Sequence, residues 1–385
     1  MNYFSSDFKL GILGGGQLGK MLLTETRKFD IQTLVIDPSP EAPAQFGCTQ
    51  FYEGSLMHFE TVYRFGKMVD LHTIEIEKEN LDALQKLEDE GLTVYPSPKT
   101  LKLIQNKGRQ KDFYIENEIP TSAYQRFVGI NTLKEAIEED YLEFPFVWKS
   151  AQFGYDGNGV KVCHSAIDLI NLPDVECIAE EMVHFKNELS VIVARNVSGE
   201  IKTYPVVEME FHPEANQVEY VICPARIDEI VAQKAREIAL KVSEKFEHVG
   251  LLAVEMFQTQ DDKILVNEVA PRPHNSGHYS IEASYTSQFE NHLRAILNLP
   301  LGNTDSKVAG IMVNLVGEDG FTGQVLYENI EKIMAIDGVT PHIYGKRETR
   351  PFRKMGHVTI VNEDIDKARQ IAEEVKMTIR VISVQ

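Results

Sequence analysis

The chain has 385 residues, a formal net charge of −19 and a hydrophobic fraction of 43%. That length exceeds one ordinary core and predicts two or three domains of about 150 residues each. The acidic balance argues against nucleic-acid binding and against docking on an anionic membrane, because both need a basic surface. Four scattered cysteines without a C-x-x-C pair favour a reducing compartment over disulfides or a zinc site.

The first residues lack a basic segment followed by a long apolar run, so we expect no signal peptide. No stretch approaches the roughly 20 apolar residues that a membrane helix needs. We therefore expect a cytoplasmic protein.

The first hundred residues predict a parallel α/β sheet. A strand, a helix and a second strand are expected at 8–15, 17–29 and 33–40. The alternation continues with a strand, a helix and a strand at 68–77, 79–91 and 92–98. Prolines 96 and 98 predict a domain boundary near residue 100.

Helices and strands are mixed in the rest of the chain. We expect helices at 100–118, 229–246, 287–299 and 364–376. We expect strands at 144–150, 176–183, 188–195, 251–257 and 263–270. Short strands accompany the last helix in the tail.

A glycine motif joins the first strand to the first helix. Gly14, Gly16 and Gly19 have the spacing G-x-G-x-x-G, which lets the backbone approach an anion at a helix N-terminus. Asp37 lies where a dinucleotide site places its ribose-binding acid. However, prolines surround Asp37, and nothing downstream suggests hydride transfer. Two interpretations stay open: a dinucleotide site and a tight turn.

A second glycine-rich stretch, WKSAQFGYDGNGV, follows the strand at 144–150. Lys149 ends that apolar strand, and a buried lysine needs an anionic partner. The glycines that follow, Gly154, Gly157 and Gly159, allow a loop to close over phosphates. The alternative is a surface hairpin with a solvated lysine.

The hairpin LLAVEMFQTQDDKILVNEVA carries a pair of acids. A turn centred between Asp261 and Asp262 places Glu255 opposite Glu268. Two facing carboxylates repel each other, and a cation between them removes the repulsion. Mg²⁺ is the natural choice, because it takes carboxylate and phosphate oxygens, and Asn267 lies beside the pair. A solvent-facing glutamate pair is the alternative.

Two further segments are rich in polar side chains. The loop PRPHNSGHYS holds Arg272, His274, Asn275, Ser276 and His278 without the spacing of a zinc helix. The segment GKRETRPFRKMGH gathers five basic residues against Glu348: Lys346, Arg347, Arg350, Arg353 and Lys354. In so acidic a chain this reversal of sign suits a phosphate, although a solvated loop with surface ion pairs is also compatible.

The sequence motifs of this chain, in their order along it, resemble those of the ATP-grasp superfamily. GGGQLGKM, IEIE, GYDGNG, VEMF with VNEVAPRPHNSGH, and RPFRKMGH are similar to the 5-(carboxyamino)imidazole ribonucleotide synthase family, the ATP-dependent carboxylases of purine biosynthesis. Another ATP-grasp ligase, such as a formate-dependent glycinamide ribonucleotide transformylase, is the alternative. A dinucleotide-dependent oxidoreductase is less favoured, because it does not need Lys149, Glu255 and Glu268 together. A non-enzymatic nucleotide sensor is also less favoured, because a sensor would be expected to lose one of the two glutamates and this chain has both.

The resemblance implies an α/β and α+β fold in three domains. These are a Rossmann-like domain (1–100), an ATP-grasp domain of two lobes (101–300) and a small mixed α/β domain (301–385). It also implies a cytoplasmic homodimer that acts on aminoimidazole ribonucleotide, ATP and bicarbonate with two Mg²⁺ ions, without a covalent enzyme intermediate.

The resemblance further implies roles for individual residues. Glu255 and Glu268 would bind metal, and Tyr155, Asp156 and His274 would serve catalysis. The ribonucleotide would be bound by Gln17, Leu18, Glu75, Glu77, Asn275, Lys346, Arg353 and Lys354. ATP would be bound by Lys107, Lys149, Gly154, Tyr155, Asp156, Gly157, Asn158, Gly159, Glu180, Glu181, Val183, Glu188, His212, Asn267 and Glu268.

Overall fold

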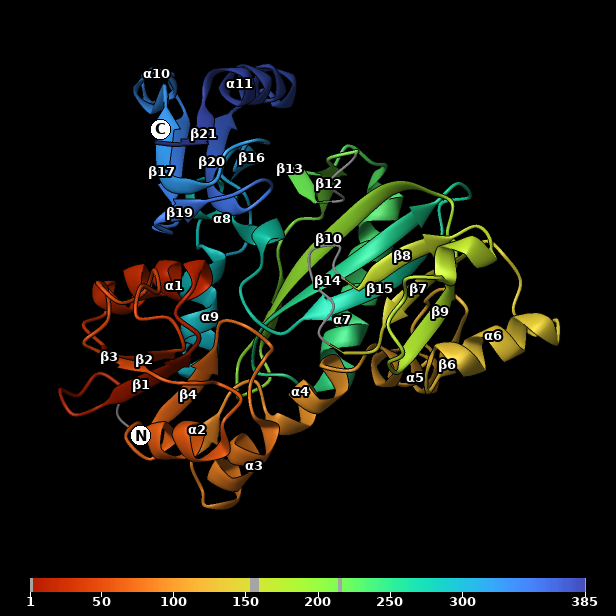
Figure 1. Cartoon of the computed structure of the whole chain (residues 1–385). Coiled ribbons are helices and arrows are strands. Elements are labelled where there is room, and N and C mark those ends of the chain that lie inside the picture. The colour runs from red at the N-terminus through yellow and green to blue at the C-terminus, as the bar shows by residue number, and fades with distance from the viewer. Residues whose placement is uncertain (1–2, 153–158, 214–216, 385) are drawn as a thin grey trace.

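The computed structural model describes residues 3–152, 159–213 and 217–384. Figure 1 shows an N-terminal domain, coloured red to orange, beside a large central sheet coloured green to teal. A small lobe with β6 to β9 flanks the sheet on its far side, and the C-terminal strands and helices, in blue, lie above the N-terminal domain. No helix among the described residues is long and apolar enough to cross a membrane.

The N-terminal domain contains a five-stranded parallel sheet in the order β3-β2-β1-β4-β5. Its strands are β1 (Lys9–Leu13), β2 (Gln32–Asp37), β3 (Gln50–Glu53), β4 (Leu71–Ile74) and β5 (Thr93–Val94). Its helices are α1 (Gln17–Lys28), α2 (Phe59–Gly66) and α3 (Leu81–Asp89). The predicted alternation is confirmed, but β4 is shorter than expected, so Glu75 and Glu77 lie in the loop that follows it.

The single helix expected at 100–118 is wrong. The chain forms α4 (Pro98–Ile104) and α5 (Lys107–Glu116) instead. Asn106 separates them, because its side chain accepts a hydrogen bond of 3.0 Å from the backbone N–H of Arg109 and so caps α5. This break places Lys107 at the first residue of a helix.

The small lobe is a four-stranded sheet in the order β6-β9-β7-β8. Its elements are β6 (Tyr124–Phe127), α6 (Ile130–Glu138), β7 (Phe146–Ser150), β8 (Val160–Cys163), the short helix η1 (Ala166–Leu169) and β9 (Cys177–Glu181). Its core includes Phe146 and Trp148, which alternate along β7 with residues whose side chains lie on the other face of the sheet.

In the described residues the central sheet has nine strands, in the order β15-β14-β10-β12-β13-β16-β20-β18 with β11 beside β10. Its strands from the middle of the chain are β10 (Phe185–Arg195), β11 (Ile201–Thr203), β12 (Val207–Phe211), β13 (Val218–Cys223), β14 (Gly250–Thr259) and β15 (Ile264–Ala270). The C-terminal strands β16 (Ala309–Val316), β18 (Val339–Ile343) and β20 (Lys354–Asn362) extend the same sheet, since β13 pairs with β16.

Helices join the central sheet to its neighbours. α7 (Glu229–Phe246) buries its apolar face on β10 and β14, as its amphipathic sequence predicts. α9 (Gln288–Ile296) shares an apolar core with α1 and so connects the central sheet to the N-terminal domain. The remaining elements are η2 (Asn275–Gly277), α8 (Ser280–Ala283), β17 (Gly323–Glu328), α10 (Ile330–Met334), β19 (Glu348–Thr349), α11 (Ile365–Thr378) and β21 (Arg380–Ser383).

Two of the chain's own carboxylates occupy the glycine turn between β1 and α1. Glu75 accepts a hydrogen bond of 2.9 Å from the backbone N–H of Gly19, and Asp37 accepts one of 2.8 Å from Gly15. A Cβ atom at Gly16 would lie 2.3 Å from Glu75 Oε1, so this position requires glycine. Asp37 therefore holds the turn, where a dinucleotide site would use it to bind a ribose.

We expect Asp37→Ala to lower the free energy of unfolding by about 1 to 3 kcal/mol, because the charged acceptor of two backbone N–H groups is lost. Chemical denaturation would measure the change. Asp7→Ala, at an exposed acid of the same domain, is the control and should change it little. Equal stability of the two variants would contradict the role assigned to Asp37.

Candidate active site

Three buried or half-buried lysines meet four glutamates between the small lobe and the central sheet. We call this the lysine–glutamate cluster; its members are Lys107, Lys111, Lys149, Glu180, Glu188, Glu255 and Glu268. They come from α5, β7, β9, β10, β14 and β15. Segments that are far apart in sequence therefore converge on one charged region.

Glu180 links two of the lysines. Its carboxylate lies 2.9 Å from Lys149 Nζ and 3.4 Å from Lys111 Nζ. Burial raises the pKa of Glu180, but Lys149 and Lys111 outweigh that effect, so the net pKa is below the usual value. Burial also lowers the pKa of Lys111 to about 8. Lys149 is thus a buried lysine with an anionic partner, as its position on an apolar strand predicts.

The predicted pairing of Glu255 with Glu268 is present across β14 and β15. Between this pair and the turn, Met256 faces Val266, so Asn267 is the extra residue of a β-bulge. The bulge lets the adjacent side chains of Asn267 and Glu268 both reach the lysines: Asn267 Oδ1 lies 2.9 Å from Lys149 Nζ, and Glu268 pairs with Lys107.

The two opposed glutamates have different electrostatic surroundings. Burial, followed by the charges of Glu268 and Glu188, raises the pKa of Glu255 to about 8. Burial also acts on Glu268, but Lys107 and Lys149 outweigh it and lower its pKa. His274 Nε2 lies 3.3 Å from Glu255 Oε1. Burial raises the pKa of nearby Glu188 to about 7.

The two glutamates fit a divalent cation bound together with a nucleotide. Carboxylate oxygens are suitable ligands for Mg²⁺, and a cation would add positive charge beside Glu255, whose pKa is raised by burial and by the charge of Glu268. The described residues contain no group of three or more His, Cys, Asp or Glu that could hold a metal alone. Such a cation would therefore draw its other ligands from phosphate and water.

The residues predicted to bind the ribonucleotide lie in four segments: 17–18, 75–77, residue 275 and 346–354. Gln17 and Leu18 begin α1. Glu75 fills the glycine turn, and Glu77 Oε1 lies 2.8 Å from Arg272 Nε. Burial raises the pKa of Glu75 to about 7, whereas the charges of Arg272 and Lys346 act in the opposite direction.

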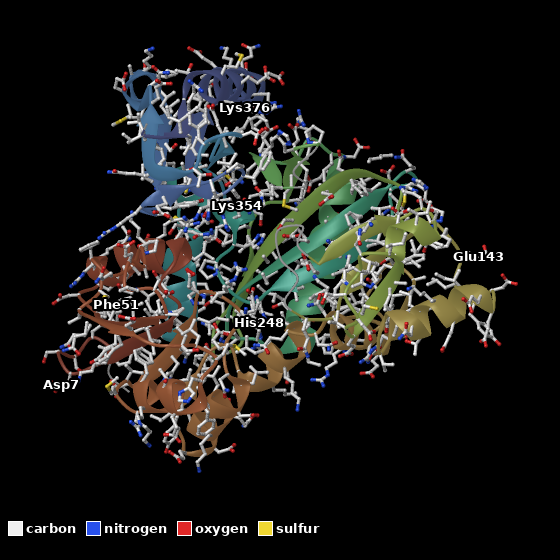
Figure 2. All side chains as sticks on the ribbon, viewed as in Figure 1. Asp7, Phe51, Glu143, His248, Lys354 and Lys376 are labelled. Atoms are coloured by element: carbon white, nitrogen blue, oxygen red, sulfur yellow. The ribbon has the colours of Figure 1, made fainter. Side chains whose placement is uncertain are left out.

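The C-terminal lysines lie near the place where the N-terminal domain, the central sheet and the C-terminal strands meet. Lys346 Nζ donates to the backbone carbonyl of Lys354, and Arg353 donates to that of Glu348. Figure 2 shows Lys354 where the blue strands meet the central sheet. The charge of Lys354 acts to lower the pKa of Glu255, and the charge of Lys346 acts to lower the pKa of Glu75. The C-terminal strands are therefore close enough to the central sheet and to the N-terminal domain to interact with both electrostatically. Asn275 exchanges two hydrogen bonds with Asn314 of β16.

The remaining predicted residues are more dispersed. Glu181 is exposed at the end of β9, and Val183 lies in the loop to β10. His212 lines a cavity of about 230 Å³ with Asn314, Phe352 and Lys376, on the side of the C-terminal strands. Gly159 precedes β8, whereas Gly154, Tyr155, Asp156, Gly157 and Asn158 lie outside the described residues.

Sequence reasoning missed several contributors. Lys111 follows Lys107 by one helical turn. A helix predicted to begin at Lys107 would have placed both lysines on one face and so identified Lys111. The roles of Asp37 and of Gln288, whose buried amide bonds to both backbone groups of His274, had no local signal.

Comparisons with known proteins agree with this geometry. Residues 8–105 match the ribonucleotide synthetase preATP-grasp domain, 112–289 the ATP-grasp domain, and 310–371 the phosphoribosylaminoimidazole carboxylase C-terminal domain. The fold and site thus define an ATP-grasp enzyme with its preATP-grasp and C-terminal domains.

Individual relatives narrow the class. The chain is 38% identical to the N5-carboxyaminoimidazole ribonucleotide synthase of Bacillus subtilis over 93% of this chain and 92% of that protein. The synthetase structure from Thermotoga maritima is 42% identical, with a TM-score of 0.89 over 98% of this chain and all of the other. The chain belongs to the N5-carboxyaminoimidazole ribonucleotide synthase family.

Two other relatives add context. The Aspergillus clavatus synthase in complex with ADP and 5-aminoimidazole ribonucleotide is 31% identical, with a TM-score of 0.85 over 97% of this chain and 98% of that one. Some relatives are longer: the chain covers 64% of the chloroplastic phosphoribosylaminoimidazole carboxylase of Vigna aconitifolia, at 38% identity over 92% of this chain.

The raised pKa of Glu255 predicts a proton release. Below about pH 8 the half-buried carboxyl of Glu255 keeps its proton, and a cation that binds the carboxylate must expel it. The apparent affinity for Mg²⁺ with ATP should therefore rise with pH and level off above about pH 8.

Titration calorimetry in buffers of different ionisation enthalpy would count the protons. We expect release of roughly one proton at pH 7 and much less at pH 9, where Glu255 is already ionised. Glu255→Gln should remove this release. Unaltered release from that variant would assign the proton to another group.

Proposed function

We propose that the chain uses ATP and bicarbonate to carboxylate the exocyclic amine of 5-aminoimidazole ribonucleotide, with ADP and phosphate as the other products. The observation that supports this most directly is the lysine–glutamate cluster, in which Glu255 and Glu268 face each other beside Lys107 and Lys149. The names of the relatives favour this reaction over glycinamide ribonucleotide transformylation.

In this proposal ATP lies between the small lobe and the central sheet. Lys107 and Lys149 bind its phosphates, and the glycine-rich stretch that follows Lys149, most of which lies outside the described residues, contributes to the same site. The segment from Glu180 to Val183 offers backbone groups to adenine, Glu188 binds the ribose hydroxyls, and His212 lies near the nucleotide. The side chain of Glu180 orients Lys149, because it pairs with that lysine at 2.9 Å.

Glu255 and Glu268, with Asn267 beside them, would hold two Mg²⁺ ions. When bound, the ions supply charge neutralisation at the transferring phosphoryl group. His274, 3.3 Å from Glu255, keeps that carboxylate oriented.

The ribonucleotide spans the N-terminal and C-terminal domains. Gln17, Leu18 and one of the acids Glu75 and Glu77 contact its ring or ribose, and Asn275 approaches from the central domain. The lysines at 346 and 354, with Arg353, neutralise its phosphate. These basic residues suit a phosphate because they form a positively charged cluster in a chain whose net charge is −19.

The reaction needs no covalent enzyme intermediate. A bicarbonate oxygen attacks the γ-phosphorus of ATP, and ADP leaves, which gives carboxyphosphate. The exocyclic amine then attacks the carboxyl carbon, phosphate leaves, and the amine loses a proton to a group among Tyr155, Asp156 and His274. The protein aligns the reactants, neutralises charge and excludes water from an intermediate that hydrolyses readily.

Several coarser features belong to the same proposal. We place the domains at 1–100, 101–300 and 301–385, although the sheet runs on across the second boundary through β13 and β16. We also propose a homodimer in the cytoplasm. Sedimentation equilibrium tests the dimer, and a single species of about 44 kDa would contradict it.

Release of ADP should depend on aminoimidazole ribonucleotide when bicarbonate and Mg²⁺ are present. Glu268→Gln should lower kcat at least a hundredfold, since about 3 kcal/mol of charge stabilisation is lost. A coupled ADP assay measures both effects. Glu90→Gln, at a surface glutamate paired with Lys67, is the matched control and should retain activity. ADP release that ignores the ribonucleotide would refute the substrate assignment.

Removal of one phosphate-binding charge should affect the ribonucleotide more than ATP. We expect Lys346→Met to raise KM for the ribonucleotide roughly 10- to 100-fold, the effect of losing a charge-assisted contact of about 1.4 to 2.8 kcal/mol. KM for ATP should change little. Lys332→Met, in α10 of the same domain, is the control. An equal rise in both KM values would contradict the phosphate role.

A further inference from the structure

Three histidine rings form a column where the central domain meets the C-terminal strands. His278 follows η2, His342 lies in β18 and His357 lies in β20. The ring centroids of His278 and His357 are 4.7 Å apart, and those of His357 and His342 are 4.5 Å apart. We call these three residues the histidine column. It joins the central domain, which is predicted to bind ATP, to the C-terminal domain, which is predicted to bind the ribonucleotide phosphate.

The column is uncharged at its buried end. Burial lowers the pKa of His278 and of His357 well below the usual value, and the nearby positive groups act in the same direction. For His278 these groups are His274, His342, Lys354 and Arg272. Neutral stacked rings pack as aromatic side chains, so the column acts as a stiff contact.

Gln288 of α9 determines how His278 is held. Its Nε2 donates to His278 Nδ1 at 2.9 Å and to the backbone carbonyl of His274 at 2.8 Å, while its Oε1 accepts from the backbone N–H of His274 at 2.9 Å. A neutral imidazole nitrogen that accepts a hydrogen bond carries no proton. His278 is therefore the tautomer with its proton on Nε2.

The packing around Gln288 leaves no freedom at this point. The amide is fully buried, and a Cβ atom at Gly277 would lie 2.4 Å from its Oε1. The same amide thus fixes the His274 backbone and the His278 ring. Because His274 contacts Glu255, one end of the histidine column is tied to the lysine–glutamate cluster.

The other end of the column is tied to the basic segment. His357 follows Lys354 by three residues on β20, and His342 precedes Lys346 by four. Between them, Tyr344 shares a hydrogen bond of 3.1 Å with His357 Nδ1, and Lys346 Nζ lies 5.7 Å from the Tyr344 ring. His342 itself pairs with Glu282 of α8 at 2.8 Å.

We propose that His278 is a positioning residue: held in one tautomer by Gln288 and stacked on His357, it fixes the lysines of the C-terminal domain relative to Glu255. The inference rests on the proposed function, in which Lys346 and Lys354 bind the ribonucleotide phosphate while carboxylation takes place near the metal-binding glutamates. An error of about 1 Å between these two ends would misplace the reacting amine and slow the reaction.

Two substitutions separate the contacts of His278. His278→Asn retains an acceptor for Gln288 but removes the stacked ring, and His278→Phe retains the ring but removes the acceptor. We expect each to raise KM for the ribonucleotide about tenfold and to lower kcat, with KM for ATP within about twofold of the wild-type value. Gln288→Leu and the double variant His278→Phe/Gln288→Leu complete a cycle, which should be strongly non-additive.

His292→Asn is the matched control. His292 is another fully buried histidine on α9, bonded to Thr73 Oγ1 at 2.8 Å and remote from the histidine column in its contacts. Its replacement should lower the unfolding midpoint without changing KM for the ribonucleotide. If His278 had only a structural role, its variants would likewise lower the unfolding midpoint and leave KM for the ribonucleotide unchanged.

Hydrogen–deuterium exchange of the free protein provides a readout without substrate. Amides of residues 339–362 should exchange faster in the His278 variants than in the wild type. Their exchange rates should be unchanged in His292→Asn. Unchanged exchange together with an unchanged KM for the ribonucleotide would overturn the proposal. If wild-type turnover does not require the ribonucleotide, the proposed function fails, while faster exchange in the variants would still support coupling of the two domains through His278.

Discussion

The site depends on one unfavourable contact, the opposition of Glu255 and Glu268 across neighbouring strands. Two half-buried carboxylates in this position repel each other, so positive charge beside them is favourable. Lys107 supplies it to Glu268, and Lys149 reaches the adjacent Asn267. Burial, together with the charges of Glu268 and Glu188, raises the pKa of Glu255. The difference between the two glutamates prepares the pair for a cation that arrives with the nucleotide.

The compensating charges come from a different part of the protein. Lys107 begins α5, and Lys149 lies on β7 of the small lobe, whereas the glutamates belong to the central sheet. The ion pair of Lys107 with Glu268 and the hydrogen bond of Lys149 to Asn267 connect these elements to the sheet, through side chains that a bound nucleotide would also contact. Nucleotide binding and the relative placement of the two bodies are therefore linked by the same charges.

The N-terminal glycine turn shows how one backbone geometry can hold different anions. Its N–H groups bind the carboxylates of Asp37 and Glu75. A Cβ atom at Gly14 or Gly16 would lie within 2.5 Å of the Glu75 side chain, and one at Gly19 would lie 3.0 Å from the carbonyl oxygen of Gly14, so the spacing of the three glycines reflects close approach within the turn. The motif describes a space beside a helix N-terminus, and the residues after β4 decide what fills that space.

The sequence by itself determined the features that depend on local periodicity and on facing residues within a hairpin. It predicted the strand–helix–strand start, helix α7 and the Glu255–Glu268 pair, because amphipathic spacing and strand pairing are short-range properties. It failed at Asn106, where a side-chain cap divides the expected helix, and at Asn267, where a bulge changes the register that the turn suggests. Only the tertiary structure decided that Lys111 meets Glu180, that Glu75 fills the glycine turn and that three histidines stack between domains. Except for His342 and His357, which lie 15 positions apart, these contacts join residues 56 to 79 positions apart in the chain, and their energies depend on burial, which no local pattern contains.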